Sequence, residues 1–200
     1  ARSDRLGRVA LEDVRDVYEG GPPTVWLTLL TTMFIHGGWM HLLGNMLFLW
    51  VFGDNVEDRL GRVKYLLFYI ITGLFASAAQ LLVNFNSGIP AIGASGAIAG
   101  VLGAYFLLFP TSQIRTVIFF FLITIISLPA YLLIGIWILL QFFSAVAGSL
   151  GGTFAGGVAY WAHVGGFAAG FLIIAAFLGV SGVRERFRRR FRGPPPGWNW

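Results

Sequence analysis

The sequence contains no cysteine, only three histidines, and few charged side chains for its length of 200 residues. Without cysteine the chain can form no disulfide and has no thiol nucleophile, and three histidines alone do not predict a structural zinc site. No structural metal site is therefore expected. Charged residues make up 12% of the chain, whereas soluble globular domains carry about 25%. The composition argues against a soluble domain.

Charged side chains are missing altogether from two long stretches, residues 65–114 and 116–183. One transmembrane helix needs about 20 apolar residues, so each stretch must hold more than one span, joined by uncharged turns. The mean hydropathy of +0.75 agrees with this interpretation. The sequence predicts an all-α membrane protein, a polytopic helical bundle.

Five full spans are predicted, with a kink at Pro129 in the fourth. Their approximate bounds are 39–56, 65–83, 95–109, 116–143 and 158–180. An uncharged turn is expected at 84–90 and a glycine-rich loop at 144–157. If the protein has a functional site at that end of the bundle, the 144–157 loop is a reasonable cap over it.

Three regions follow from this division: an external or interfacial segment at 1–35, a transmembrane core at 36–183 and a basic tail at 184–200. Within the first region, 1–23 is predicted to hold a short surface helix, and 25–35 is apolar but too short to span. The tail is expected to be disordered, above all at its proline-rich end.

Ten of the fourteen Lys and Arg residues lie in the loops after the first, third and fifth spans. By the positive-inside rule these loops and the tail face the cytoplasm, which also explains the pI near 10.1 without a nucleic-acid partner. The opposite ends of the same spans then lie near the external face. Binding of the tail to anionic lipid is a secondary expectation.

Ser95 stands between Gly93 and Gly96 at the start of an apolar helix, where an N-cap or first turn is expected. Gly96, Gly100 and Gly103 then recur at helical spacing and leave one side of that helix bare, which favours close packing of a second helix. Two interpretations follow. Ser95 is a nucleophile, or it simply begins a helix that packs through glycines.

Other polar residues share the predicted external level with Ser95. His41 and Asn45 are four residues apart and lie on one side of the first span, and His163 opens the last span with Gly166 and Gly170 on its own face. Polar side chains in a bilayer are usually buried in protein or face water. If the glycine faces pack together, the Ser95 hydroxyl and the His163 imidazole come within hydrogen-bond reach. The alternative for each is an ordinary interhelical hydrogen bond.

The sequence has no acidic residue between Asp58 and Glu185. Glu57 and Asp58 lie at the far, cytoplasmic end of the span that carries His41, about 24 Å away at ~1.5 Å per residue. Unless the amino-terminal segment reaches the site, no carboxylate is expected to orient His163, and any nucleophilic chemistry would use a Ser–His dyad whose imidazole is held by helix packing. The Ser95 backbone N–H at the helix start, with the side chains of His41 and Asn45, would then stabilise an oxyanion.

Three short motifs occur in order between residues 36 and 170. They are His36-x4-His41-x3-Asn45, Gly93-Ala94-Ser95-Gly96, and Ala162-His163-Val164-Gly165-Gly166 followed by Gly170. In this order they resemble the rhomboid family of intramembrane serine proteases, as does the segment 53–59.

The resemblance implies Ser95 as nucleophile, His163 as general base and then acid, and His41, Asn45 and the Ser95 amide as oxyanion hole. It assigns supporting positions to a further set: His36, Gly93, Gly96, Gly166 and Gly170. The implied substrates are single-pass membrane proteins, cut near the external edge of their helices after a small residue. The implied location is a prokaryotic plasma membrane, and no cofactor is implied.

Two departures from the family pattern are visible. The first of six family spans has no counterpart, which predicts that the chain is a fragment, and Ala99 stands where some relatives place a Tyr against the catalytic imidazole. Two other functions remain open: a catalytically inactive rhomboid-like binder of membrane proteins, and a small transporter with polar groups along its pathway.

Overall fold

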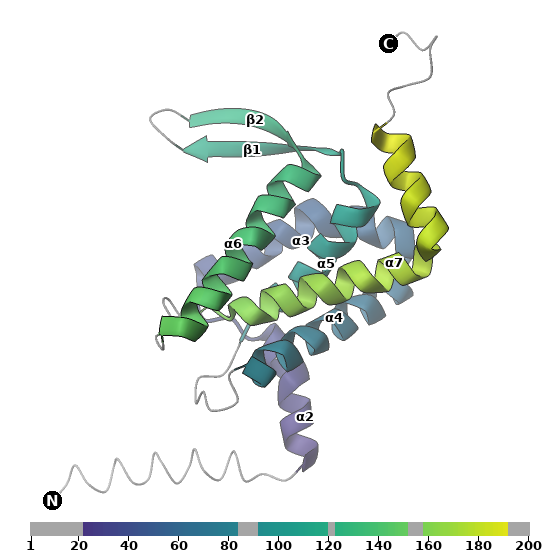
Figure 1. Ribbon diagram of the computed structural model, residues 1–200. Coiled ribbons are helices and arrows are strands. Elements are labelled where there is room, and N and C mark those ends of the chain that lie inside the picture. Colours follow the sequence, from purple (N-terminus) through teal and green to yellow (C-terminus); the bar gives the residue numbers. More distant parts are fainter. Residues whose placement is uncertain (1–21, 84–91, 120–122, 152–157, 192–200) are drawn as a thin grey trace, which may run out of the picture.

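A computed structural model describes residues 22–83, 92–119, 123–151 and 158–191, and within these ranges the chain is helical apart from one β-hairpin (Figure 1). The elements are α2 (Pro22–Thr31), the 3-10 turn η1 (Thr32–Phe34), α3 (Trp39–Leu60), α4 (Arg62–Val83), α5 (Ser95–Leu108), β1 (Gln113–Phe119), β2 (Ile123–Pro129), α6 (Ala130–Gly151) and α7 (Tyr160–Phe191).

Helix α5 forms the centre of the fold. Figure 1 shows it behind α7 and between α3 and α4, and it contacts all three. Every residue of α5 except Ser95 and Phe106 is buried. Its small residues allow this close enclosure; a Cβ added at Gly103, for example, would overlap the backbone carbonyl oxygen of Phe167 on α7.

In the part of the chain that the structure describes, three helices are long and apolar enough to cross a bilayer by length and composition: Arg62–Val83, Ala130–Leu150 and Tyr160–Gly179. The predicted count of five spans is not confirmed. Helix α5 has 14 residues, about 21 Å at 1.5 Å per residue, which is short for a core of about 30 Å. Helix α3 has 22 residues, but polar side chains such as those of His41, Asn45 and Asp54 lower its hydropathy.

The prediction of one kinked span at 116–143 is wrong. Residues 113–119 and 123–129 form the antiparallel strands β1 and β2, paired from Gln113 with Pro129, and helix α6 begins only at Ala130. A long apolar segment can form either a membrane-spanning helix or a pair of strands. These residues are rich in β-branched Ile, Val and Thr, which favour strands. Pro129 ends a strand and does not kink a helix.

Two other boundaries differ from the expectation. Residues 144–151, assigned to the glycine-rich loop, continue α6, and residues 184–191, assigned to a disordered tail, continue α7. Helix α7 bends at Gly179, whose φ of 68° favours glycine, and its last turns point away from the bundle (Figure 1). Residues 25–34 lie in α2 and η1. The expectations for 1–21, 84–91, 152–157 and 192–200 lie outside the described residues.

Candidate active site

Ser95 is the first residue of α5, as its place in the sequence predicts. Gly93, two residues earlier, has a φ of +112° and donates its N–H to the Thr32 carbonyl at 2.9 Å, so the turn before the helix is tied to η1. The first N–H groups of a helix have no carbonyl partner within it. The Ser95 hydroxyl therefore lies beside free backbone donors at the positive end of the helix dipole.

His163 lies in the first turn of α7, and only 8% of its surface is exposed. Its Nε2 is 2.9 Å from Ser95 Oγ, a hydrogen-bond distance between residues 68 positions apart in the chain. The proximity expected from the two glycine faces is therefore present.

The glycine faces explain how α5 and α7 come so close. A Cβ added at Gly166 would overlap the carbonyl oxygen of Gly96, and one added at Gly170 would overlap the carbonyl oxygen of Gly100. The two backbones touch directly, in the small-residue packing predicted from the sequence. This contact sets the separation of Ser95 and His163, which lie one turn or less from it.

His41 and Asn45 approach the same turn from α3. A Cβ on Gly93 would lie 2.6 Å from His41 Cε1 and 3.7 Å from Asn45 Nδ2. His41 Nδ1 accepts the N–H of Gly37 at 3.4 Å, so its proton is on Nε2, which is directed towards Gly93. Asn45 Nδ2 is buried and has no hydrogen-bond partner among the described residues.

An unpaired buried donor is costly, so Asn45 calls for an explanation. An oxyanion-binding site would explain it, because the donors of such a site stay free until the reacting oxygen is present. His36, from the same motif, packs edge-on against the His41 ring at 5.2 Å, and its Nε2 is likewise buried without a partner in the described ranges. His36 thus supports the ring of His41.

Sequence reasoning missed the groups that hold the His163 ring. Gln141 Oε1 on α6 lies 2.7 Å from His163 Nδ1. The Trp137 ring lies 5.7 Å from the imidazole at an interplanar angle of 36°, and the Tyr160 ring lies 6.4 Å away, edge-on. These two aromatic rings pack on His163 from α6 and from the start of α7. A polar residue inside an apolar helix was the available signal for Gln141.

A partly open cavity adjoins Ser95, large enough for a water molecule or a small side chain. Its walls are small or apolar residues, among them Gly73, Ala76, Ala97, Ala159 and Ala162. The hydroxyl is therefore not sealed into dry helix contacts. Within the described ranges, no three metal-ligating side chains lie close enough to hold an ion.

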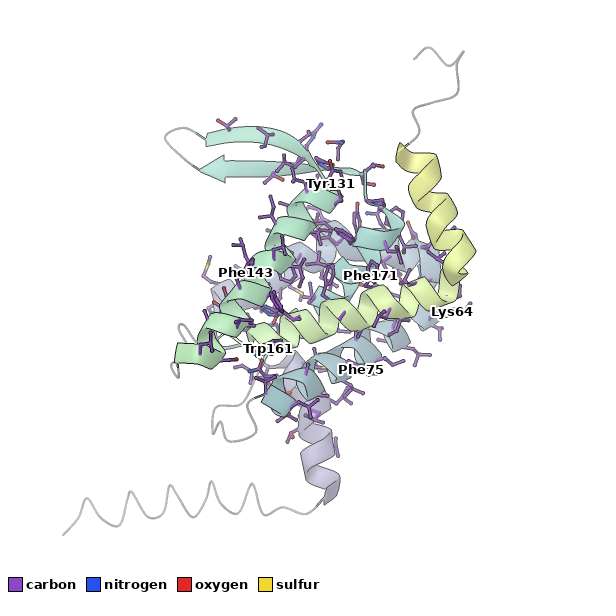
Figure 2. All side chains as sticks on the ribbon, viewed as in Figure 1. Lys64, Phe75, Tyr131, Phe143, Trp161 and Phe171 are labelled. Atoms are coloured by element: carbon purple, nitrogen blue, oxygen red, sulfur yellow. The ribbon has the colours of Figure 1, made fainter. Side chains whose placement is uncertain are left out.

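The site lies at one end of the bundle. Figure 2 shows Trp161 where α7 meets α6 and Lys64 at the other end of the same helix layer. Lys64 Nζ lies 6.0 Å from the ring of Phe177, which follows His163 by 14 residues, about 21 Å along the helix. The basic residues at the start of α4 are thus far from the Ser–His pair, as the predicted topology requires.

The fold and the site define a helical integral membrane protein in which a serine and a histidine from two closely packed helices meet. A family model described as the Rhomboid domain matches residues 23–180. The chain belongs to the rhomboid family.

Similarity to individual proteins covers much of the chain. It is 32% identical over 189 residues to RHOMBOID-like protein 4 of Arabidopsis thaliana, covering 86% of this chain and 43% of the relative. It is 31% identical over 169 residues to Rhomboid protein 1, mitochondrial, of Saccharomyces cerevisiae, covering 82% of this chain and 45% of the relative. With Rhomboid protease GluP of Bacillus subtilis it shares 43% identity over 79 residues, 40% of this chain and 15% of the relative. The chain spans less than half the length of each.

Proposed function

We propose that the protein is an intramembrane serine endopeptidase in which Ser95 is the nucleophile and His163 the general base. The observation that carries the proposal is the 2.9 Å contact between Ser95 Oγ and His163 Nε2 at the start of a buried helix. A hydroxyl is a weak nucleophile until an adjacent base takes its proton, and this contact supplies the base. Family membership supports a protease-like activity.

The chemistry proceeds in two halves. Ser95 Oγ attacks the scissile carbonyl carbon while its proton moves to His163 Nε2, and the resulting tetrahedral intermediate collapses when the C–N bond breaks and His163 protonates the leaving amine. Water then attacks the acyl-enzyme ester, giving its proton to His163. Collapse of the second intermediate breaks the ester bond, and the proton returns to Ser95.

The oxyanion formed in each half needs donors at the start of α5. The Ser95 backbone N–H, His41 Nε2–H and Asn45 Nδ2–H are the proposed three, and the lack of a hydrogen-bond partner for Asn45 Nδ2 among the described residues supports its role. Loss of one such donor typically costs about 2.7–4 kcal/mol of transition-state stabilisation.

The proposed substrates are single-pass membrane proteins. Because the Ser–His pair lies at the end of an apolar helix bundle, a substrate helix reaches it from the lipid near one membrane face. The cavity beside Ser95 is lined mainly by alanine and glycine and suits a small side chain at the cleaved bond. The external face and a prokaryotic plasma membrane remain predictions, since similar proteins include a mitochondrial and a chloroplastic one by name.

The test is cleavage of a single-span reporter in proteoliposomes by the wild type and by Ser95→Ala and His163→Ala. Removal of either partner of a catalytic Ser–His pair costs on the order of 10⁶ in kcat, so both variants should show no detectable cleavage. Ser127→Ala, an exposed serine on β2, is the matched control and should cleave as the wild type does. If the wild type and all the variants bind the reporter and none of them cleaves it, the protein is instead an inactive rhomboid-like binder.

A further inference from the structure

We propose that Gln141 is the positioning residue of His163 and takes the place that a carboxylate has in a Ser-His-Asp triad; this inference rests on the proposed function. Gln141 belongs to α6, whereas Ser95 and His163 belong to α5 and α7. Its Oε1 lies 2.7 Å from His163 Nδ1, on the ring edge opposite to the one that meets Ser95. The imidazole is therefore held between two hydrogen bonds, one on each nitrogen.

The chemistry of an amide oxygen fixes the proton. Because Oε1 can only accept, His163 Nδ1 must carry the hydrogen and donate it to Gln141. The neutral ring then has its lone pair on Nε2, directed at Ser95 Oγ 2.9 Å away. This is the tautomer that a general base needs. The other tautomer would direct an N–H at Ser95 and could not take its proton.

The side of α6 that faces His163 is built for this task. Trp137 and Gln141 are four residues apart and so share one side of the helix, with the Trp137 ring lying over the imidazole and the Gln141 amide meeting its edge. Tyr160 meets the ring edge-on from the start of α7. These contacts restrict both the tilt and the rotation of the imidazole. Because the Gln141 amide is neutral, it holds the ring without placing an unpaired charge in the protein interior.

The chain offers a matched control in Gln80 on α4. Its Oε1 accepts the backbone N–H of Ala162 at 3.1 Å, next to His163 in sequence, and its side chain is buried. Gln80 therefore anchors the first turn of α7 without forming a hydrogen bond to the imidazole. Replacing it removes a buried amide of the same size near the same residue while leaving the Gln141 contact in place.

The first measurement is the protonation of His163 in the detergent-solubilised wild type, by ¹⁵N–¹H correlation of ring-labelled histidine. The sequence has three histidines, and the His163 signal is the one lost in His163→Ala. We expect hydrogen on Nδ1 and none on Nε2. A ring with its proton on Nε2 would overturn the proposal whether or not the protein cleaves anything, so its failure is distinct from failure of the proposed protease.

The second measurement compares Gln141→Met, Gln141→Glu and Gln80→Met. Met fills a similar volume but removes the strong acceptor, so Gln141→Met should mix the two His163 tautomers and lower kcat for the reporter by about tenfold or more; a wrong tautomer in Ser-His-Asp proteases costs about 10⁴-fold. Glu keeps an acceptor oxygen and should retain both the Nδ1–H signal and most of the rate.

Gln80→Met should lower the melting temperature yet keep the Nδ1–H signal. Wild-type cleavage and an unchanged ring signal in Gln141→Met would show that Gln141 only fills space and would overturn the assignment. Equal loss in Gln141→Met and Gln141→Glu, with both rings still protonated on Nδ1, would overturn it as well.

Discussion

The close approach of α5 and α7 makes Gly166→Ala the most informative packing variant. The new methyl group would overlap the Gly96 carbonyl oxygen and lie 3.0 Å from the Gly96 carbonyl carbon and 3.3 Å from Ala76 Cβ. Ordinary contacts of a Cβ begin at about 3.4 Å, and two of these neighbours are backbone atoms that cannot rotate away. The helices must therefore separate by on the order of 1 Å, since protein interiors leave no spare volume.

Overpacking of this kind costs about 1–3 kcal/mol. For a chain of this size each kcal/mol shifts the melting temperature by about 2–4 °C, so the expected loss is roughly 2–12 °C. Gly166 follows His163 by three residues and Gly96 follows Ser95 directly, so the same separation lengthens the 2.9 Å Ser–His contact. A misplacement of about 1 Å can cost about 10²-fold in rate.

Both quantities are accessible, the melting temperature from the fluorescence of the seven tryptophans in detergent and the rate from reporter cleavage. The control is Gly148→Ala on α6, where an added Cβ meets nothing within 4 Å. Replacing a glycine inside a helix by alanine stabilises the helix by up to about 1 kcal/mol. The Gly148→Ala variant should therefore melt at or slightly above the wild-type temperature. A Gly166→Ala protein with wild-type melting and rate would refute the close packing described above.

Two further substitutions test the oxyanion donors and the turn before α5. Asn45→Ala should lower kcat by about 10²–10³, less than Ser95→Ala does, and equal losses would contradict a supporting role. Gly93→Ala adds a Cβ that meets the His41 ring at a φ of +112°, and should reduce both stability and cleavage. Gly61→Ala, at a φ of +80° and ψ of 153° with open space around it, should cost about 1–3 kcal/mol of stability but leave cleavage intact; a matching loss of cleavage would show that backbone strain alone explains the Gly93 result.

The features that could be predicted from the sequence are those encoded by local pattern. The glycines around Ser95 indicate where its helix begins. Gly166 and Gly170 lie on the same face as His163 and indicate which side of the last helix packs against it. Two complementary glycine stripes admit few arrangements, so their periodicity, together with the loop charges that put Ser95 and His163 at the same level, predicted the Ser–His proximity.

The β-hairpin and Gln141 depend on information that local pattern lacks. Residues 113–129 are as apolar as a span, and only their β-branched content and pairing distinguish them. Gln141 reaches His163 through the crossing of α6 over α7, which no glycine stripe on α6 specifies. A single helix over 116–143 has no apolar or glycine face that fixes its rotation about its own axis, so the sequence does not show that Gln141 faces His163.

The most direct test of the Ser–His account is to locate the adduct of a fluorophosphonate, which reacts with an activated serine, by mass spectrometry of the labelled protein. We expect one adduct, on Ser95, in the wild type and none in His163→Ala. An adduct on any other residue, or undiminished labelling of Ser95 without His163, would contradict it.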